Sequence, residues 1–282
     1  MTAQIAMTEQ LYSPIAPLAD PADSASRLLV VAIGIQIALL LPSLVALGID
    51  ERTLNGISVW SKPLKFQTSL IVMLATLLLL LPFIDAKARA GRGVRLAALT
   101  AAVTATGEIA YITLQAARGR ASHFNTETVL EARAYDIMGV GAALLVLSGL
   151  AIGVYLLRRP AADAPKGVLL GGGWGLILGS VLTLATAFVL GSGLIDGPGH
   201  WVGGVTSDVG GLPLFGWSRT GGDLRVPHFF ATHIMQALPI AGLFLDRFAP
   251  RHLRAGMIAA ALLSVAVVAG TFLQAVAGQP FI

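Results

Sequence analysis

The range 167–190 reads GVLLGGGWGLILGSVLTLATAFVL and carries no charged side chain. At a rise of ~1.5 Å per residue, a helix of this length crosses the ~30 Å of hydrocarbon in a bilayer. Lipid offers no hydrogen-bond partner to an open backbone, so a segment that spans it must be helical. The stretch therefore predicts a transmembrane helix, and its glycines predict close contact with a neighbouring helix.

Six further apolar stretches have a similar length, at 27–48, 66–85, 94–117, 136–157, 228–248 and 253–277. The composition agrees, with 55% hydrophobic and 12% charged residues and a mean hydropathy of +0.78. The sequence predicts an all-α polytopic membrane protein with about seven transmembrane helices and long outer loops. Residues 27–282 form the single transmembrane domain, and the polar, proline-bearing range 1–26 is expected to be a disordered cytoplasmic tail.

Lysine and arginine are concentrated in the short connections after the second, fourth and sixth spans. The positive-inside rule places these connections in the cytoplasm. The N-terminus is then cytoplasmic and the C-terminus lies outside, as expected for a multi-pass protein of the cell inner membrane.

Several classes of function are excluded by missing features. Cysteine is absent, so the chain has no disulfide and no thiolate ligand or nucleophile. It has no phosphate-binding glycine motif, and no basic, aromatic-laced soluble surface that would suit a nucleic acid. The expected partners are the lipid bilayer and a membrane or periplasmic protein.

The third span contains a carboxylate far from either of its ends. An ionisable group inside the membrane is costly and suggests a functional role. Thr104, Glu108, Tyr111 and Gln115 recur at the spacing of one helical face, which we expect to line the bundle interior. Glu108 and Tyr111 are candidate catalytic residues, and Gln115 is a candidate for substrate binding.

The densest polar group lies at 217–236, WSRTGGDLRVPHFFATHIMQ, where a glycine-rich loop enters the sixth span. It contains His233, a third candidate catalytic residue, and Gln236, a candidate substrate ligand. The helical rise places His233 and Gln236 about 9 and 13 Å below Pro227, a depth similar to that of Glu108. The alternative role for the glutamines is hydrogen bonding between helices.

Four of the five histidines fall on the predicted outer side: His123, His200, His228 and His233. Imidazole in this position can bind a metal or haem, or carry protons. His123 and His228 are candidate binding residues, and His228 and His233 are candidate metal ligands. A separation of five residues turns a helix by about 140°, so His228 and His233 should point to different faces and need ligands from other elements. The alternative is hydrogen bonding in loops.

The outer loops also carry arginines that suit an anionic substrate or a haem propionate, because guanidinium binds carboxylates in a bidentate manner. The candidates are Arg118, Arg120, Arg219 and Arg225. The alternative is that they form ion pairs with nearby acidic residues and fix the loops to helix ends.

Three functions remain open. The first is electron transfer or oxidoreduction at a haem, metal or quinone site near the outer leaflet. The second is proton-coupled transport of a small molecule, which suits an intramembrane carboxylate but lacks polar groups on the cytoplasmic half. The third is a non-catalytic assembly or partner protein that docks through its outer loops.

Overall fold

The computed structural model describes residues 23–282, so most of the predicted tail, residues 1–22, lies outside the described range. The first helix of the described range, α2 (Ser24–Ile49), begins inside the segment expected to be disordered. Asp23 explains this early start, because its carboxylate accepts a hydrogen bond from the Ala25 N–H at 3.1 Å and caps the helix.

The described chain contains seven helices that are long and apolar enough to cross a membrane. After α2 they are α3 (Ser61–Leu80), α5 (Arg92–Ala117), α6 (Val129–Arg158), α7 (Lys166–Ser192), α8 (Arg225–Phe248) and α9 (Leu253–Val276). Short helices follow α3 and α8, namely η1 (Leu81–Phe83), α4 (Ala86–Arg89) and η2 (Pro250–His252). The prediction of an all-α polytopic membrane protein with seven spans is confirmed.

Several helices extend beyond the apolar stretches that identified them. The clearest case is α6, which begins at Val129 rather than near Asp136. The Thr128 hydroxyl accepts a hydrogen bond from the Glu131 N–H at 3.2 Å, and this cap starts the helix. Hydropathy detects only the residues that match the lipid, so a polar first turn is missed.

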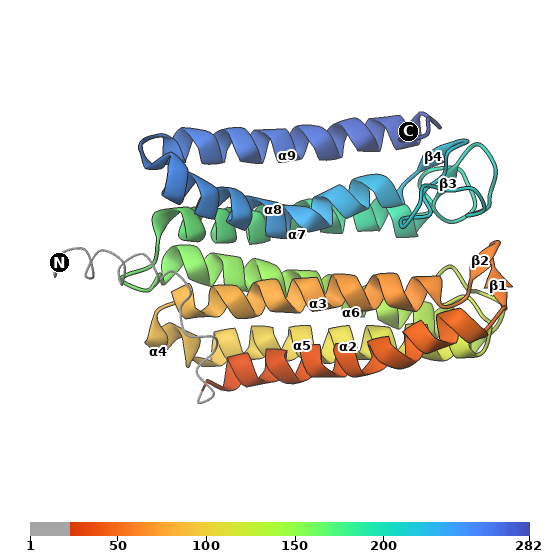
Figure 1. The fold of residues 1–282 in the computed structure, drawn as a ribbon, viewed down its shortest axis with the longest axis horizontal. Coiled ribbons are helices and arrows are strands. Elements are labelled where there is room, and N and C mark those ends of the chain that lie inside the picture. Colours follow the sequence, from red (N-terminus) through yellow and green to blue (C-terminus); the bar gives the residue numbers. More distant parts are fainter. Residues whose placement is uncertain (1–22) are drawn as a thin grey trace, which may run out of the picture.

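Two short antiparallel ribbons lie together at one end of the bundle (Figure 1). The first pairs β1 (Thr53–Leu54) with β2 (Ile57–Ser58), and the second pairs β3 (Trp201–Val202) with β4 (Gly222–Asp223). We call this the loop end, formed by residues 50–60, 118–128 and 193–224. The opposite, basic end is formed by the short connections 81–91, 159–165 and 249–252.

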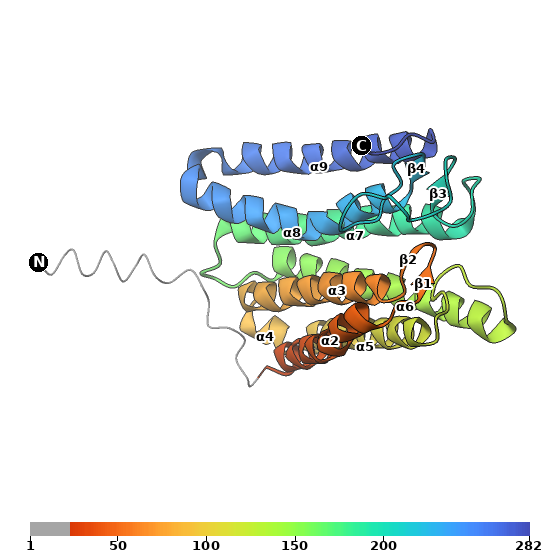
Figure 2. The same ribbon diagram turned by 45° about the vertical axis from the view of Figure 1, so that its right-hand side comes forward.

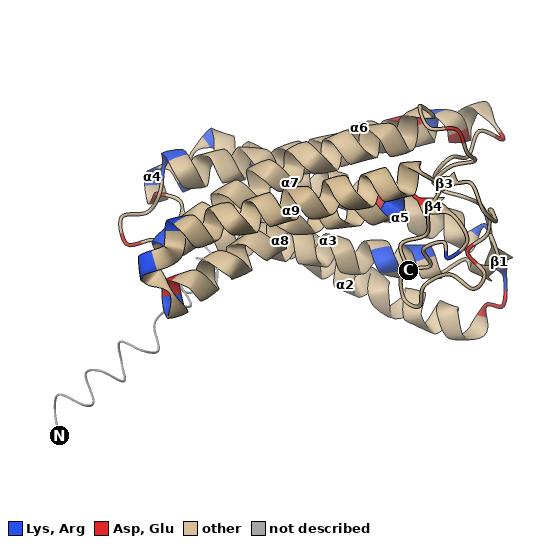
Figure 3. Ribbon diagram, turned by 90° about the horizontal axis from the view of Figure 1, so that it is seen from above, with Lys and Arg blue, Asp and Glu red and all other residues tan. Residues whose placement is uncertain are grey.

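Charged residues gather at these two ends and leave the middle of the bundle largely free of charge (Figure 3). At the basic end, the Asp85 N–H donates to the Arg159 carbonyl at 2.8 Å, and Arg89 pairs with Asp23 at 3.4 Å. The grouping of the three basic connections at one end is therefore as expected. It makes the chain suitable for insertion across a bilayer in one orientation.

The helices form two groups that stack on one another (Figures 1 and 2). The first four long helices, α2, α3, α5 and α6, pack together. The last three continue the stack, with α7 against α6, α8 against α7 and α9 at the outer edge.

Glycines bring α7 and α8 into close contact. A methyl group added to Gly171 would collide with the Leu238 carbonyl and the Pro239 backbone, and one added to Gly175 would lie 2.9 Å from Pro239 Cδ. Small residues are the usual means of close helix approach in membranes, where no hydrophobic force drives helices together. The expected role of the glycines in the fifth span is confirmed.

Apolar side chains fill the interior of the basic half of the bundle. Four leucines from α2, α3, η1 and α6, and one isoleucine just after η1, are completely or almost completely buried there: Leu29, Leu77, Leu81, Leu156 and Ile84. Because such interiors are close-packed, this half holds the helices together without a polar pathway among these side chains. The polar side chains of interest lie towards the loop end.

Candidate functional site at the loop end

Glu108 of α5 is a buried carboxylate towards the loop end, and Lys62 stands in the first turn of α3. The Glu108 side chain is buried, and its Oε1 lies 3.1 Å from the position that a Cβ on Gly141 of α6 would occupy. Lys62 provides the positive charge that acts on Glu108. Within residues 23–282 neither side chain makes a hydrogen bond, and no ion pair within 4 Å joins the two.

A row of rings leads from Lys62 across the loop end. Lys62 Nζ lies 5.8 Å from the centre of the Phe66 ring, a cation–π contact. The Phe66 and His123 rings are 5.4 Å apart, and His123 and Tyr135 are 5.9 Å apart. The row joins α3, the loop 118–128 and α6, so His123 lies beside the ring that Lys62 contacts.

His123 is held as a neutral imidazole. Burial, together with the nearby charge of Lys62, lowers the pKa of His123 well below its ordinary value. Its Nδ1 lies 3.1 Å from the Ser122 hydroxyl. The ring is therefore able to donate or accept a hydrogen bond at neutral pH without carrying charge.

Arg225 is tied to two aspartates of the long loop. It contacts Asp208 at 2.8 Å and Asp223 at 2.7 Å. Asp223 also accepts hydrogen bonds from the backbone N–H groups of Ser218 and Arg225 at 3.0 Å. The positive start of α8 is thus occupied by the chain's own carboxylate, and the ion-pair alternative holds for Arg225.

His200 packs beside this ion cluster, with Nε2 3.8 Å from Asp208 Oδ1 and its ring 4.0 Å from that of Trp201. Burial lowers the pKa of His200 by more than the neighbouring carboxylate raises it. Burial alone would raise the pKa of Asp208, but His200 and Arg225 outweigh this effect and lower it. The separation of 3.8 Å is too long for a hydrogen bond, so the interaction is electrostatic.

Glu131 lies at the centre of a group of polar contacts that includes Arg118, Arg120 and Gln115. Arg120 pairs with Glu131 at 2.7 Å and with Glu127. Arg118 donates to the Gln115 side-chain oxygen at 2.7 Å, and the Gln115 amide donates to the Ala121 carbonyl at 3.0 Å. These contacts fix the loop 118–128 to α5 and α6, which favours the structural alternative for all three residues.

The α8 histidines point to different neighbours, as the helical spacing predicted. His228 Nδ1 lies 3.2 Å from the Thr186 hydroxyl of α7. His233 Nδ1 lies 3.1 Å from the Gln236 side-chain oxygen, and the Gln236 amide donates to Thr76 of α3 at 3.1 Å. No group of three or more histidines and carboxylates suitable for a metal occurs within residues 23–282.

Two other candidates lie apart from these contacts. The Tyr111 hydroxyl is buried and has no hydrogen-bond partner in the described range. Arg219 is exposed on the loop. On the same helical face as Tyr111, Glu108 and Gln115 are buried and Thr104 is half-buried, so this face lies inside the bundle as expected.

The sequence did not identify Lys62, Asp208 or Asp223 as members of the site. Lys62 follows Trp60 at the start of a span, a pattern typical of an interfacial anchor. The place of Lys62 at the start of a helix near the loop end could have suggested a role in the site. Its relation to Glu108, however, depends on how α3 packs on α5.

Comparison with known proteins does not assign the chain to a family. No protein-family model, no curated protein and no solved structure matches the chain. The protein is therefore assigned to the multi-pass helical membrane proteins on its architecture alone.

Proposed function

We propose that this membrane protein exchanges protons with a quinone at the loop end, as part of an electron-transfer reaction. The observation that supports this function best is the burial of Glu108 within range of the Lys62 charge, where neither side chain makes a hydrogen bond to residues 23–282. An acid and a base that are not committed to structure are suited to proton transfer.

Quinone chemistry matches the side chains around this pair. Reduction of a quinone consumes two electrons and two protons and yields a quinol, and oxidation reverses this balance. Lys62 and His123 can donate hydrogen bonds to a quinone oxygen, and Glu108 can accept or return a proton. Phe66 and Tyr135 supply ring faces for packing against an aromatic head group. The electrons come from or go to a partner protein that docks on the loop end.

The histidine arrangement favours a quinone over a bound metal. His228 contacts Thr186 of α7, whereas His233 contacts Gln236 of its own helix, and the described residues do not assemble three ligands at one place. We retain both histidines as candidate haem ligands, because each needs only one further axial partner.

We further propose that the loop end faces the outside of a cell inner membrane and that the basic end is cytoplasmic. The three basic connections lie together at one end, as the positive-inside rule requires. In this orientation quinone protons are exchanged at the outer leaflet.

The test uses detergent-purified protein with bound quinone extracted and quantified, and with absorption spectra of the oxidised and reduced states. Quinol oxidation with an artificial electron acceptor is then compared between the wild type and Glu108→Gln. We expect a loss of at least about 100-fold in rate, the usual contribution of a general acid–base group, with unchanged expression. Glu51→Gln, the same change at an exposed loop-end carboxylate, is the control.

Wild-type turnover in Glu108→Gln would remove Glu108 from the mechanism. A Soret band lost in His233→Ala would replace the quinone with haem as the redox group. Absence of both quinone binding and a cofactor signal would contradict the redox proposal.

The alternative function is proton-coupled transport, and one observation favours it. The Thr76–Gln236–His233 chain places polar groups between the two helix groups, where a substrate path would run. Proton-dependent uptake by sealed vesicles, lost in Gln236→Leu, would establish transport. Without uptake or turnover, docking of a partner protein remains as the third function.

A further inference from the structure

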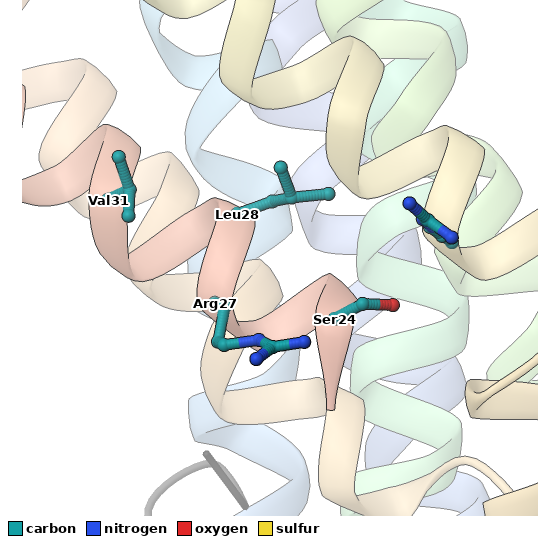
Figure 4. A pocket seen from close by; sticks show the side chains of 5 residues that line it. Ser24, Arg27, Leu28 and Val31 are labelled. Carbon is teal, nitrogen blue, oxygen red and sulfur yellow. The ribbon is translucent and has the colours of Figure 1, made fainter. Parts of the chain in front are cut away.

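A pocket of ≈ 270 Å³ opens at the basic end, where α2 and α5 begin (Figure 4). Its lining combines two arginines with apolar and small side chains: Ser24, Arg27, Leu28, Val31 and Arg95. The pocket lies at the opposite end of the bundle from Glu108 and takes no part in the proposed proton exchange.

The two arginines have no compensating charge in the described part of the chain. Neither Arg27 nor Arg95 makes a side-chain hydrogen bond or an ion pair with residues 23–282. The nearest acidic residue in the sequence, Asp23, already pairs with Arg89 at 3.4 Å and caps α2. Both guanidinium groups are exposed and available to an anion.

The lining of the pocket changes from charged to apolar along the axis of α2. Arg27 and Arg95 each stand in the first turn of their helix, so they lie at a similar depth near the membrane surface. Val31 lies one turn further along α2, about 6 Å deeper, and is 61% exposed.

We propose that this pocket binds an anionic phospholipid, with its phosphate between Arg27 and Arg95 and an acyl chain along Leu28 and Val31. Guanidinium groups bind phosphate oxygens in a bidentate manner. Basic pockets between transmembrane helices are suited to anionic head groups, and the apolar surface below the arginines suits a chain that a free phosphate lacks. Bound lipid would join the first turns of α2 and α5.

The experiment measures lipid binding to the purified full-length chain by native mass spectrometry, with phosphatidylglycerol and phosphatidylcholine added separately. The double variant Arg27→Gln/Arg95→Gln is compared with Arg247→Gln/Arg254→Gln, which removes the same charge from the same end outside the pocket. We expect phosphatidylglycerol to bind about 30-fold more weakly to the pocket variant, with little change in the control.

Equal weakening in both double variants would show general attraction to the basic end and would overturn the proposal. Equal binding of phosphatidylcholine to the wild type would also overturn it. Inorganic phosphate that protects the protein from heat as well as the lipid would indicate a soluble anion instead. If the double variant does not fold, Arg27→Lys keeps the charge but loses the bidentate geometry, and we expect its affinity to fall severalfold.

Discussion

Gln236 of α8 donates a hydrogen bond to the hydroxyl of Thr76 of α3 across 3.1 Å, and this bond links the two groups of helices. The Thr76 hydroxyl in turn donates to the Val72 carbonyl of its own helix at 2.7 Å. The side-chain oxygen of Gln236 lies 3.1 Å from Nδ1 of His233. A continuous polar chain thus runs from α3 to α8 through an otherwise apolar contact.

This contact predicts a measurable coupling between Thr76 and Gln236. In a double-mutant cycle of Thr76→Val and Gln236→Leu, we expect a coupling free energy of about 0.6 kcal/mol, the average for such bonds inside membrane proteins. Thermal or detergent unfolding of the four proteins provides the measurement. Thr68→Val is the control for Thr76, because the Thr68 hydroxyl donates to Leu64 of its own helix. Equal coupling for both threonines would show that the bond is not specific.

Gly171→Ala should destabilise the contact between α7 and α8 by about 1–3 kcal/mol, because the added methyl group meets backbone atoms that cannot move aside. The yield of folded protein and its melting temperature in detergent measure the loss. Gly107→Ala on α5 is the control, since nothing lies within 4 Å of its added methyl group. We expect the control to be neutral or slightly stabilising. A stable Gly171→Ala protein would be inconsistent with the close approach of the two helices.

Arg225→Gln should open the long loop, because it leaves the carboxylates of Asp208 and Asp223 buried without their cation. Removal of one partner from a buried ion pair costs about 3–5 kcal/mol. Limited proteolysis should therefore cut residues 193–224 faster than in the wild type. Arg219→Gln changes an exposed arginine of the same loop and should leave the cleavage rate unchanged. Equal rates in the two variants would mean that the ion cluster does not hold the loop.

The loop end should become less stable as the pH falls below about 6.5. Burial lowers the pKa of His200 from its ordinary value of 6.5, so the opened loop binds the proton more strongly than the closed one. Stability is therefore greatest above pH 6.5 and decreases towards pH 5. The pKa of Asp208 is also lowered, so that carboxylate remains charged in this range.

Hydrogen exchange of residues 193–224 at pH 7.5 and 5.5 measures this effect after correction for the intrinsic rate. His200→Phe should reduce the difference in protection between the two pH values, while His252→Phe at the basic end should not. The pKa of His123 is lowered in the same direction, so we expect its protonation to contribute to the part that remains. A loop that gains protection in acid would contradict the neutral, buried state of His200.

The fold was largely predictable from hydropathy, because the bilayer leaves helices as the form of an apolar span. All seven spans were identified, and the glycine-rich range 167–190 correctly indicated close helix contact. The errors lie at the polar ends, as at Val129, where the start of the helix depends on the Thr128 cap rather than on lipid contact.

The site was less predictable, because its relations join distant parts of the chain. The sequence singled out Glu108 through the cost of its charge in the membrane, yet the charge of Lys62 acts on it only because α3 packs on α5. Arg118, Arg120 and Arg225 stood out as possible anion ligands. Their engagement with Gln115, Glu131 and the loop aspartates depends on three-dimensional proximity that residue spacing does not determine.

The packed leucines of the basic half have a consequence for bioenergetics. A carboxylate at the depth of Glu108 would conduct protons across the membrane if files of water reached it from both sides. Close-packed residues such as Leu77, Leu81 and Leu156 leave such a file no room among them, so they act as insulation below the carboxylate. In the proposed function, Glu108 would then exchange protons with one compartment while the gradient across the bilayer is preserved.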